Sequence, residues 1–99
     1  MSRIVVLFEL QGMTSKDYDA ILQTMREKGR LFNDQRTMHV SYEKDGAWCV
    51  VDVWESEEAL ENFAKNDLMP AFQKLNINPP MPQVFPVYNT MGVEEVISA

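Results

Sequence analysis

Apolar and polar positions alternate along this chain with two different periods, and these periods predict where its strands and helices lie. Residues 4–8 form a β-branched and aromatic run that predicts a strand buried on both faces. Apolar residues spaced three and four positions apart then predict a helix over residues 15–28, with Thr14 or Ser15 as its N-cap. Gly29 follows the last turn and supplies the left-handed conformation in which many helices end.

Two strand-like runs come next, residues 37–43 and 48–54, on either side of the dipeptide Asp45-Gly46. This dipeptide is a strong hairpin signal, because both central residues of a type I′ turn need positive φ. The two runs therefore predict a pair of antiparallel strands joined by a tight turn.

A second helix is predicted to follow the hairpin. Ser56 is its N-cap, and the glutamates just after it favour the positive end of a helix. We expect the helix to break or kink at residues 65–67, because Asn66-Asp67 resembles a second cap placed shortly before Pro70.

A fourth strand is predicted over residues 84–88, after a proline-rich loop, and its Pro86 favours an edge position or a bulge. Residues 93–99 form a short tail, either frayed or laid against a partner. The order β-α-β-β-α-β predicts one α+β domain over residues 1–99 with a ferredoxin-like fold, in which an antiparallel sheet carries both helices on one face.

Two helices cover only one face of such a sheet. On the central hairpin, one set of alternating residues carries no charge: Met38, Val40, Tyr42, Cys49, Val51 and Val53. The opposite set holds two tryptophans among polar groups, so neither face is typical of a solvent-facing surface. A large exposed apolar patch usually marks an interface. We therefore expect a homodimer that buries the sheet face left uncovered by the helices.

The composition of the chain mainly indicates which binding partners and sites to exclude. The 99 residues carry a net charge of −6, which repels phosphate backbones and anionic lipid, so we expect no nucleic-acid binding and no membrane anchoring. The longest apolar runs have five residues, far fewer than the ~18 needed to span a bilayer. The lone Cys49 excludes an internal disulfide and, with a single histidine, a self-contained zinc site. We expect a reducing, cytoplasmic setting.

The hairpin register decides which polar groups face each other. A two-residue turn pairs His39 with Asp52 and Thr37 with Trp54. A three-residue loop with a bulge would instead place Asp52 opposite Met38. We favour the first register, because it matches apolar residues with apolar residues along one whole face.

His39 and Asp52, once paired, have the arrangement that a general base uses. The carboxylate fixes the tautomer of the imidazole and favours its charged form. Trp54 and Trp48 lie on the same face and would supply a flat apolar wall for an aromatic substrate. The competing interpretation is a structural cross-strand pair, or one at the dimer interface, with both tryptophans in the core.

Two further residues are weaker candidates for lining a cavity. Glu9 ends the first strand, where it either lines a site or faces solvent, and Asn89 follows the last strand, at a cavity mouth or in a turn. The acidic residues after position 54 are expected to form a solvated helix start, not a metal site. No phosphate loop, nucleophile elbow or dinucleotide fingerprint appears.

Residues 51–60, with the sequence Val-Asp-Val-Trp-Glu-Ser-Glu-Glu-Ala-Leu, lead into Phe63 and residues 67–72. This pattern resembles the third strand and second helix of the dimeric α/β-barrel proteins, and most closely the antibiotic-biosynthesis-monooxygenase-like small proteins. The resemblance implies two sheets packed back to back into a barrel, with a ligand cavity between each sheet and its helices. Members include cofactor-independent oxygenases of aromatic substrates and haem-degrading enzymes.

This chain departs from that family's pattern at functional positions. The oxygenase-like members often carry a histidine in or just after the second helix, where this chain has Phe63. Gln73 stands where the haem degraders place their iron ligand, and Glu9 falls near their strand-one asparagine. We therefore expect no haem and no other cofactor.

Through the resemblance, the sequence predicts monooxygenase-like, cofactor-independent oxidation or proton-transfer chemistry on a small aromatic or polyketide-like compound. His39 would be the base, Asp52 would orient it, and Trp54 and Phe63 would form the cavity wall. The alternative is a non-enzymatic small-molecule-binding or accessory dimer that uses the same cavity.

Overall fold

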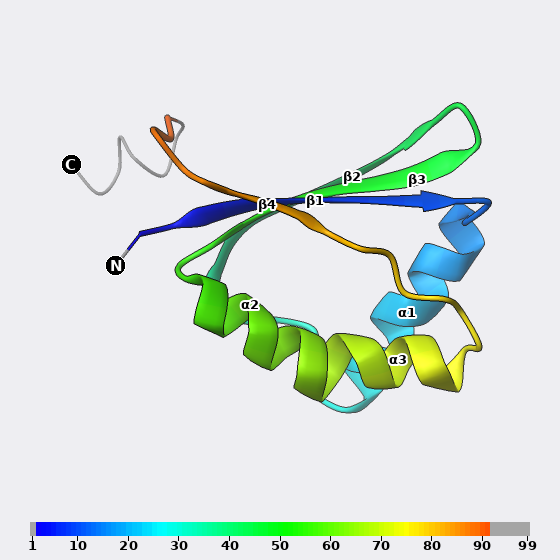
Figure 1. The fold of residues 1–99 in the computed structure, drawn as a ribbon. Helices are drawn as coiled ribbons and strands as arrows, with labels where there is room; N and C mark the ends of the chain where they lie inside the picture. The colour runs from blue at the N-terminus through cyan, green and yellow to red at the C-terminus, as the bar shows by residue number, and fades with distance from the viewer. Residues whose placement is uncertain (1, 92–99) are drawn as a thin grey trace.

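The computed structural model describes residues 2–91. Its elements are, in order, β1 (Ile4–Gln11), α1 (Ser15–Glu27), β2 (Arg36–Lys44), β3 (Ala47–Trp54), α2 (Glu57–Phe63), the π-helical segment η1 (Ala64–Leu68), α3 (Met69–Lys74) and β4 (Gln83–Pro86). The strands form one antiparallel sheet in the order β2-β3-β1-β4. All helices lie on one face of this sheet, which confirms the ferredoxin-like arrangement (Figure 1). The tail at residues 93–99 lies outside the described residues.

Helix α1 begins and ends where the sequence predicts. Of the two possible caps, Thr14 is used: its hydroxyl accepts a hydrogen bond from the backbone N–H of Asp17 at 3.2 Å, and the Asp17 carboxylate accepts one from the N–H of Thr14. This capping box satisfies two amides that the helix itself cannot pair. Gly29 follows the helix with φ of 70°, a conformation that costs glycine little.

The β2–β3 hairpin has the expected two-residue turn. Asp45 and Gly46 have φ of 50° and 81°, as a type I′ turn requires. The ladder pairs Lys44 with Ala47 and continues to His39 opposite Asp52, so the register favoured from the sequence is confirmed.

The far end of this ladder differs from the prediction. A β-bulge lies between Arg36 and Met38, so that Arg36, and not Thr37, stands opposite Trp54. Thr37 is the extra residue, and its hydroxyl donates to the carbonyl of Val53 at 3.3 Å. The bulge turns the Arg36 side chain toward the helices, where its guanidinium carbon lies 5.7 Å from the centre of the Trp54 ring.

The second helix, predicted to break or kink at residues 65–67, does not break there but departs from regular α-helix over η1. The chain stays helical from α2 through η1 into α3, and neither Asn66 nor Asp67 caps a new helix. Pro70 has no N–H to donate to the preceding turn, and the wider π turn just before it carries the helix past this position. The carboxylate of Asp67 binds Arg30 instead.

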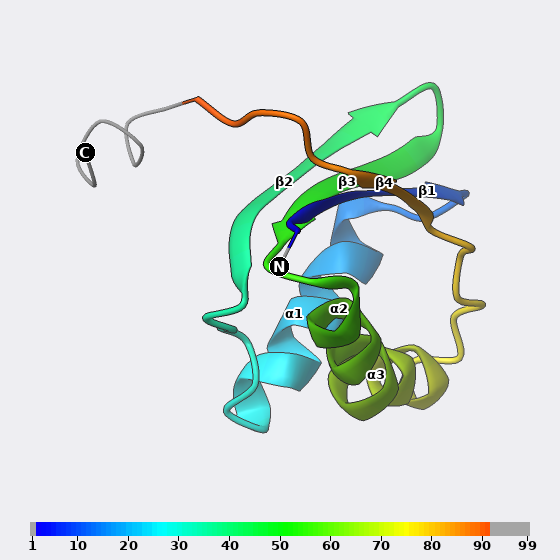
Figure 2. The same ribbon diagram turned by 60° about the vertical axis from the view of Figure 1, so that its left-hand side comes forward.

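Strand β1 is buried on only one face within the single chain. Ile4, Val6 and Leu10 face the helices and are buried, whereas Leu7 on the opposite face is partly exposed. Within one chain the helices cover one side of the sheet only (Figure 2), so burial of the second face of β1 would require a partner. Pro86 lies in β4 at the edge of the sheet, as predicted, where a missing N–H costs no ladder bond.

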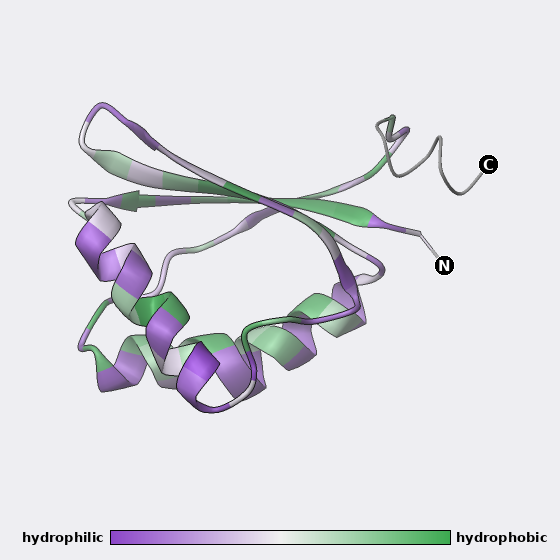
Figure 3. Cartoon of the chain, turned by 180° about the vertical axis from the view of Figure 1, so that it is seen from behind, coloured by the Kyte–Doolittle hydropathy of each residue, from purple (hydrophilic) through white to green (hydrophobic). Residues whose placement is uncertain are grey.

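The hydrophobic core lies between the sheet and the helices, and hydrophobic residues concentrate along the middle of the sheet (Figure 3). The opposite sheet face, which we call the open face, remains apolar and exposed. Its exposed large apolar residues are Met38, Val40, Tyr42 and Phe85, each at 44–50% of full exposure. No described helix is long and apolar enough to cross a membrane.

Candidate functional site

The pair predicted from the hairpin register forms on the helix-facing side of the sheet. His39 Nδ1 lies 2.5 Å from Asp52 Oδ1, and their side chains are 27% and 4% exposed respectively. An ionised carboxylate accepts hydrogen bonds only, so the proton of this bond sits on Nδ1. Asp52 thereby fixes the tautomer of His39 and leaves Nε2 free to accept a proton.

Tyr18 of α1 forms a hydrogen bond to this second ring nitrogen, Nε2. Its hydroxyl oxygen lies 2.5 Å from His39 Nε2, and with the proton of His39 on Nδ1 the phenol is the donor. The two rings are parallel within 4°, and their centroids are 6.0 Å apart, so they meet end to end through the hydrogen bond. The result is a continuous chain from Tyr18 through His39 to Asp52.

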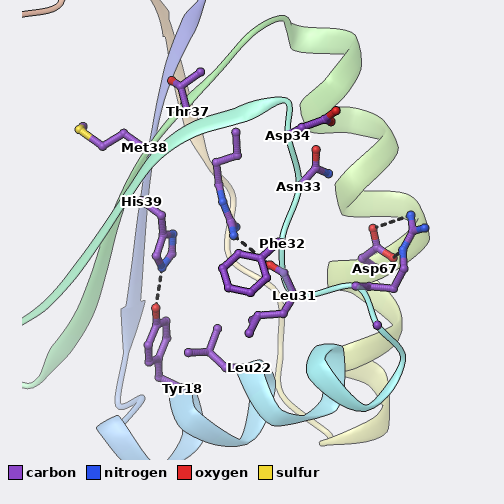
Figure 4. Close-up of a pocket in the computed structure, with 13 residues that line it drawn as sticks. Tyr18, Leu22, Leu31, Phe32, Asn33, Asp34, Thr37, Met38, His39 and Asp67 are labelled. Atoms are coloured by element: carbon purple, nitrogen blue, oxygen red, sulfur yellow. Dashed lines mark hydrogen bonds and ion pairs between the residues drawn. The ribbon is translucent and has the colours of Figure 1, made fainter. Parts of the chain in front are cut away.

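A cleft of about 940 Å³ opens beside this chain (Figure 4). It lies between α1, the α1–β2 loop, the first residues of β2 and η1. Its lining residues are Tyr18, Leu22, Gly29, Arg30, Leu31, Phe32, Asn33, Asp34, Arg36, Thr37, Met38, His39 and Asp67. Tyr18 and His39 point toward each other along its wall. We call this cleft the loop pocket.

The space enclosed between sheet and helices is much smaller. It measures about 50 Å³, and its walls are almost entirely apolar. Four residues line both this void and the loop pocket: Tyr18, Leu22, Arg36 and His39. The Tyr18–His39 hydrogen bond therefore lies at the boundary between the small apolar void and the open cleft.

Arg36 is the second polar group at this boundary. Its Nη2 donates to the carbonyl of Leu31 at 3.2 Å, and its guanidinium lies 5.5 Å from the centre of the Phe63 ring. These contacts hold the cation between the aromatic core and the α1–β2 loop. Among residues 2–91, no carboxylate forms an ion pair with Arg36.

A bidentate ion pair closes the other end of the loop pocket. Arg30 Nε and Nη2 donate to the two carboxylate oxygens of Asp67 at 2.7 and 3.2 Å. The hydrogen bonds and the charge of Asp67 raise the pKa of Arg30 above its ordinary value, so this guanidinium stays charged. The pair links the α1–β2 loop to η1, and each of its two charges is balanced by the other.

The structure separates the other predicted site residues. Trp54 is fully buried, with its ring centre 5.0 Å from that of Phe63, and it lines neither space. Phe63 does line the small void. Trp48 packs against Tyr18, with ring centres 5.2 Å apart. The wall predicted from Trp54 is therefore core.

Glu9 and Asn89 lie away from His39. Glu9 is exposed on the open face, and its carboxylate accepts a hydrogen bond from Gln11 Nε2 at 3.4 Å. Asn89 follows β4 and is exposed, outside the loop pocket. Within residues 2–91, no three His, Cys, Asp or Glu side chains are grouped to hold a metal ion.

Sequence reasoning missed Tyr18 and Arg36. Tyr18 is one of the regularly spaced apolar residues that predict α1, and the signal in the sequence is that a phenol on a core-facing stripe needs a partner for its hydroxyl. Arg36 stood in the polar connection before the hairpin, and nothing in the residue pattern indicates the bulge that turns it inward.

Several solved structures share this fold. The cofactor-independent oxygenase SnoaB from Streptomyces nogalater is 14% identical, with a TM-score of 0.64 over 92% of this chain and 98% of that one. A protein from Caulobacter crescentus, described as a candidate antibiotic biosynthesis monooxygenase, is 11% identical with a TM-score of 0.67 over 89% and 92%. Rv0793 from Mycobacterium tuberculosis is 15% identical with a TM-score of 0.67 over 92% and 100%.

No protein-family model matches the sequence, and no curated protein matches it either. The likeness to solved structures confirms the resemblance in fold that the sequence suggested.

Proposed function

We propose that this protein catalyses a cofactor-independent, monooxygenase-like oxidation of a small aromatic compound bound in the loop pocket. The observation that carries the proposal is the hydrogen-bonded chain from Asp52 through His39 to Tyr18, which ends at the pocket wall. Such a chain can accept a proton from a bound molecule and delocalise the resulting charge.

The reaction needs only the substrate and dioxygen. The substrate gives up a proton from an acidic ring CH₂ to Tyr18 as the phenol proton passes to His39 Nε2, and Asp52 stabilises the imidazolium that forms. The electron-rich anion then reduces dioxygen. One oxygen atom becomes a carbonyl on the ring carbon and the other leaves as water, according to R₂CH₂ + O₂ → R₂C=O + H₂O.

The likeness in fold supports this reaction class. SnoaB is described as a cofactor-independent oxygenase, and the Caulobacter crescentus protein as a candidate monooxygenase. In this chain the base would come from β2, and the proton relay from α1, two elements held together by the Tyr18–His39 hydrogen bond.

We also propose that the protein acts as a homodimer through its open face. This face presents Met38, Val40, Tyr42 and Phe85 as exposed apolar side chains, and apolar surface of this kind favours burial. A second copy would present the same apolar face, so a twofold axis would bury both faces at once, whereas a different partner would need its own matching apolar surface. The resemblance to the dimeric α/β-barrel proteins implies the same packing.

Oxygen consumption with 1,8-dihydroxyanthrone, which carries an acidic ring CH₂, tests the proposed activity. We expect uptake above the uncatalysed rate, and a fall of about 10²-fold or more in Tyr18→Phe and His39→Gln. Ser41→Ala is the matched control, because Ser41 lies two residues from His39 on the same strand but outside the pocket. Uptake no faster than in buffer, or unchanged in His39→Gln, would overturn the proposal.

A non-enzymatic binding protein is the second candidate. The observation that favours it is that both ring nitrogens of His39 already have a hydrogen-bond partner within the protein, as in a structural network. A binding protein would be stabilised thermally by the anthrone, according to RT ln(1 + [L]/Kd), without forming the quinone product.

A further inference from the structure

We infer that the loop pocket recognises an aromatic compound bearing a carboxylate, which binds to the guanidinium of Arg36. This inference rests on the proposed function, because it takes the loop pocket as the reacting site and adds the class of its substrate. A planar guanidinium can bind a carboxylate through two parallel hydrogen bonds, which fixes both position and orientation.

Two charged groups that line the pocket, Arg36 and Asp34, have no ion-pair partner among the described residues. Arg30 is paired with Asp67, and His39 with Asp52. Asp34 is the remaining acidic group in the lining; it is exposed and accepts a hydrogen bond from Gln35 Nε2 at 3.4 Å. Arg36 is therefore the cation of the pocket without a carboxylate partner among the described residues.

Arg36 is also held in place before any ligand arrives. One of the five N–H groups of its guanidinium bonds to Leu31, and the rings of Trp54 and Phe63 lie 5.7 and 5.5 Å from its central carbon. A partly buried cation that is already fixed loses little conformational entropy on binding an anion. These contacts leave other N–H donors for a ligand.

The rest of the pocket suits an aromatic ring. Leu22, Leu31 and Phe32 supply apolar surface, and Phe32 is 91% exposed on the α1–β2 loop. The volume of about 940 Å³ lies within the range of small-molecule sites. Because Arg36 and His39 line the same wall, a carboxylate held by Arg36 would bring the ring beside the Tyr18 hydroxyl.

Calorimetric titration with a matched pair of probes tests this inference. The probes are 1-hydroxy-2-naphthoate and 1-hydroxy-2-naphthamide, which differ in charge but hardly in shape. We expect the full-length protein to bind the acid at least tenfold more tightly than the amide. Arg36→Gln should abolish this preference, and Arg36→Lys should keep part of it because the charge remains.

Arg26→Gln is the control, since Arg26 is an exposed arginine of α1 outside the pocket. This variant should prefer the acid over the amide as strongly as the native protein does. Circular dichroism checks that each variant is folded; if Arg36→Gln is not, the acid–amide comparison in the native protein and in Arg36→Lys decides. Equal affinity for acid and amide, binding of neither, or a preference that survives Arg36→Gln would overturn the inference.

This experiment is independent of turnover. A carboxylate preference that depends on Arg36, without oxygen uptake in the anthrone assay, would support this inference and contradict the proposed oxidation. Oxygen uptake in the anthrone assay without a carboxylate preference would support the proposed oxidation and contradict this inference.

Discussion

His39 and Tyr18 join strand β2 to helix α1 through a single hydrogen bond, 2.5 Å between Nε2 and the phenol oxygen. The bond spans the boundary between the enclosed void and the loop pocket, since both residues line both spaces. The proposed base is therefore in contact with the pocket both directly and through Tyr18. Substitutions that disturb this bond affect chemistry and local packing together, so variants must be chosen to separate the two effects.

The substitution Asp52→Asn best separates the effect on chemistry from the effect on packing. An amide of the same shape fills the site of Asp52, whose side chain is 4% exposed, but it no longer fixes the His39 tautomer or stabilises its positive charge. We expect turnover to fall by about 10²–10⁴-fold while the unfolding free energy changes by less than about 1.5 kcal/mol.

Steady-state oxygen uptake and urea denaturation measure the two quantities. Asp19→Asn, at an exposed position of α1, is the matched control and should change neither. If Asp52→Asn kept full turnover, Asp52 would be a structural partner of His39 only.

Trp54 is predicted to matter for stability more than for binding. It is fully buried, so Trp54→Ala should lower the unfolding free energy by about 3–5 kcal/mol. Trp54→Phe should cost less than half of that, because the indole N–H has no hydrogen-bond partner to lose among the described residues. A loss below about 1 kcal/mol for Trp54→Ala in urea denaturation would mean that the ring borders a water-filled space.

The open face predicts how the chain assembles. The native protein should have twice the 11.4 kDa chain mass in light scattering at micromolar concentration. Val40→Glu places a charge at a 46% exposed position on this face and should give a folded monomer. Gln73→Glu adds the same charge on the exposed side of α3 and should stay dimeric. A native mass of one chain would contradict the homodimer.

Gly46 is predicted to be replaceable only at a cost. Its φ of 81° lies in the left-handed region, and a Cβ added there would meet no atom within 4 Å, so the cost is conformational. Gly46→Ala should lower the unfolding free energy by about 1 kcal/mol in urea denaturation. Asp45→Asn should be close to neutral, because asparagine tolerates the φ of 50° at that position. An unchanged Gly46→Ala variant would argue against the type I′ turn.

The local parts of this structure could be predicted from the sequence because local chemistry decides them. Asp45-Gly46 selects a two-residue turn, and the turn alone sets the register that brings His39 opposite Asp52. Thr14 and Asp17 likewise determine where α1 begins, through a capping box that links residues three positions apart.

The remaining parts depend on contacts between distant segments. Tyr18 reaches His39 only because of the angle at which α1 crosses the sheet, and a residue pattern carries no information on that angle. Alternation also places Trp54 on the helix-facing side without telling a packed interior from a cavity wall. The π-helical η1 was missed because an irregular helix and a broken helix leave the same proline and polar residues in the sequence.

The extra residue at Thr37 has a consequence for how this scaffold can diversify. Regular pairing without the bulge would instead place Thr37 opposite Trp54 and turn Arg36 toward the open face, away from the loop pocket. The strands, the turn and the dyad of His39 and Asp52 would all remain. Loss or gain of this bulge at the strand entrance is thus a short evolutionary route to new ligand preferences, shorter than rebuilding the interior by point substitution.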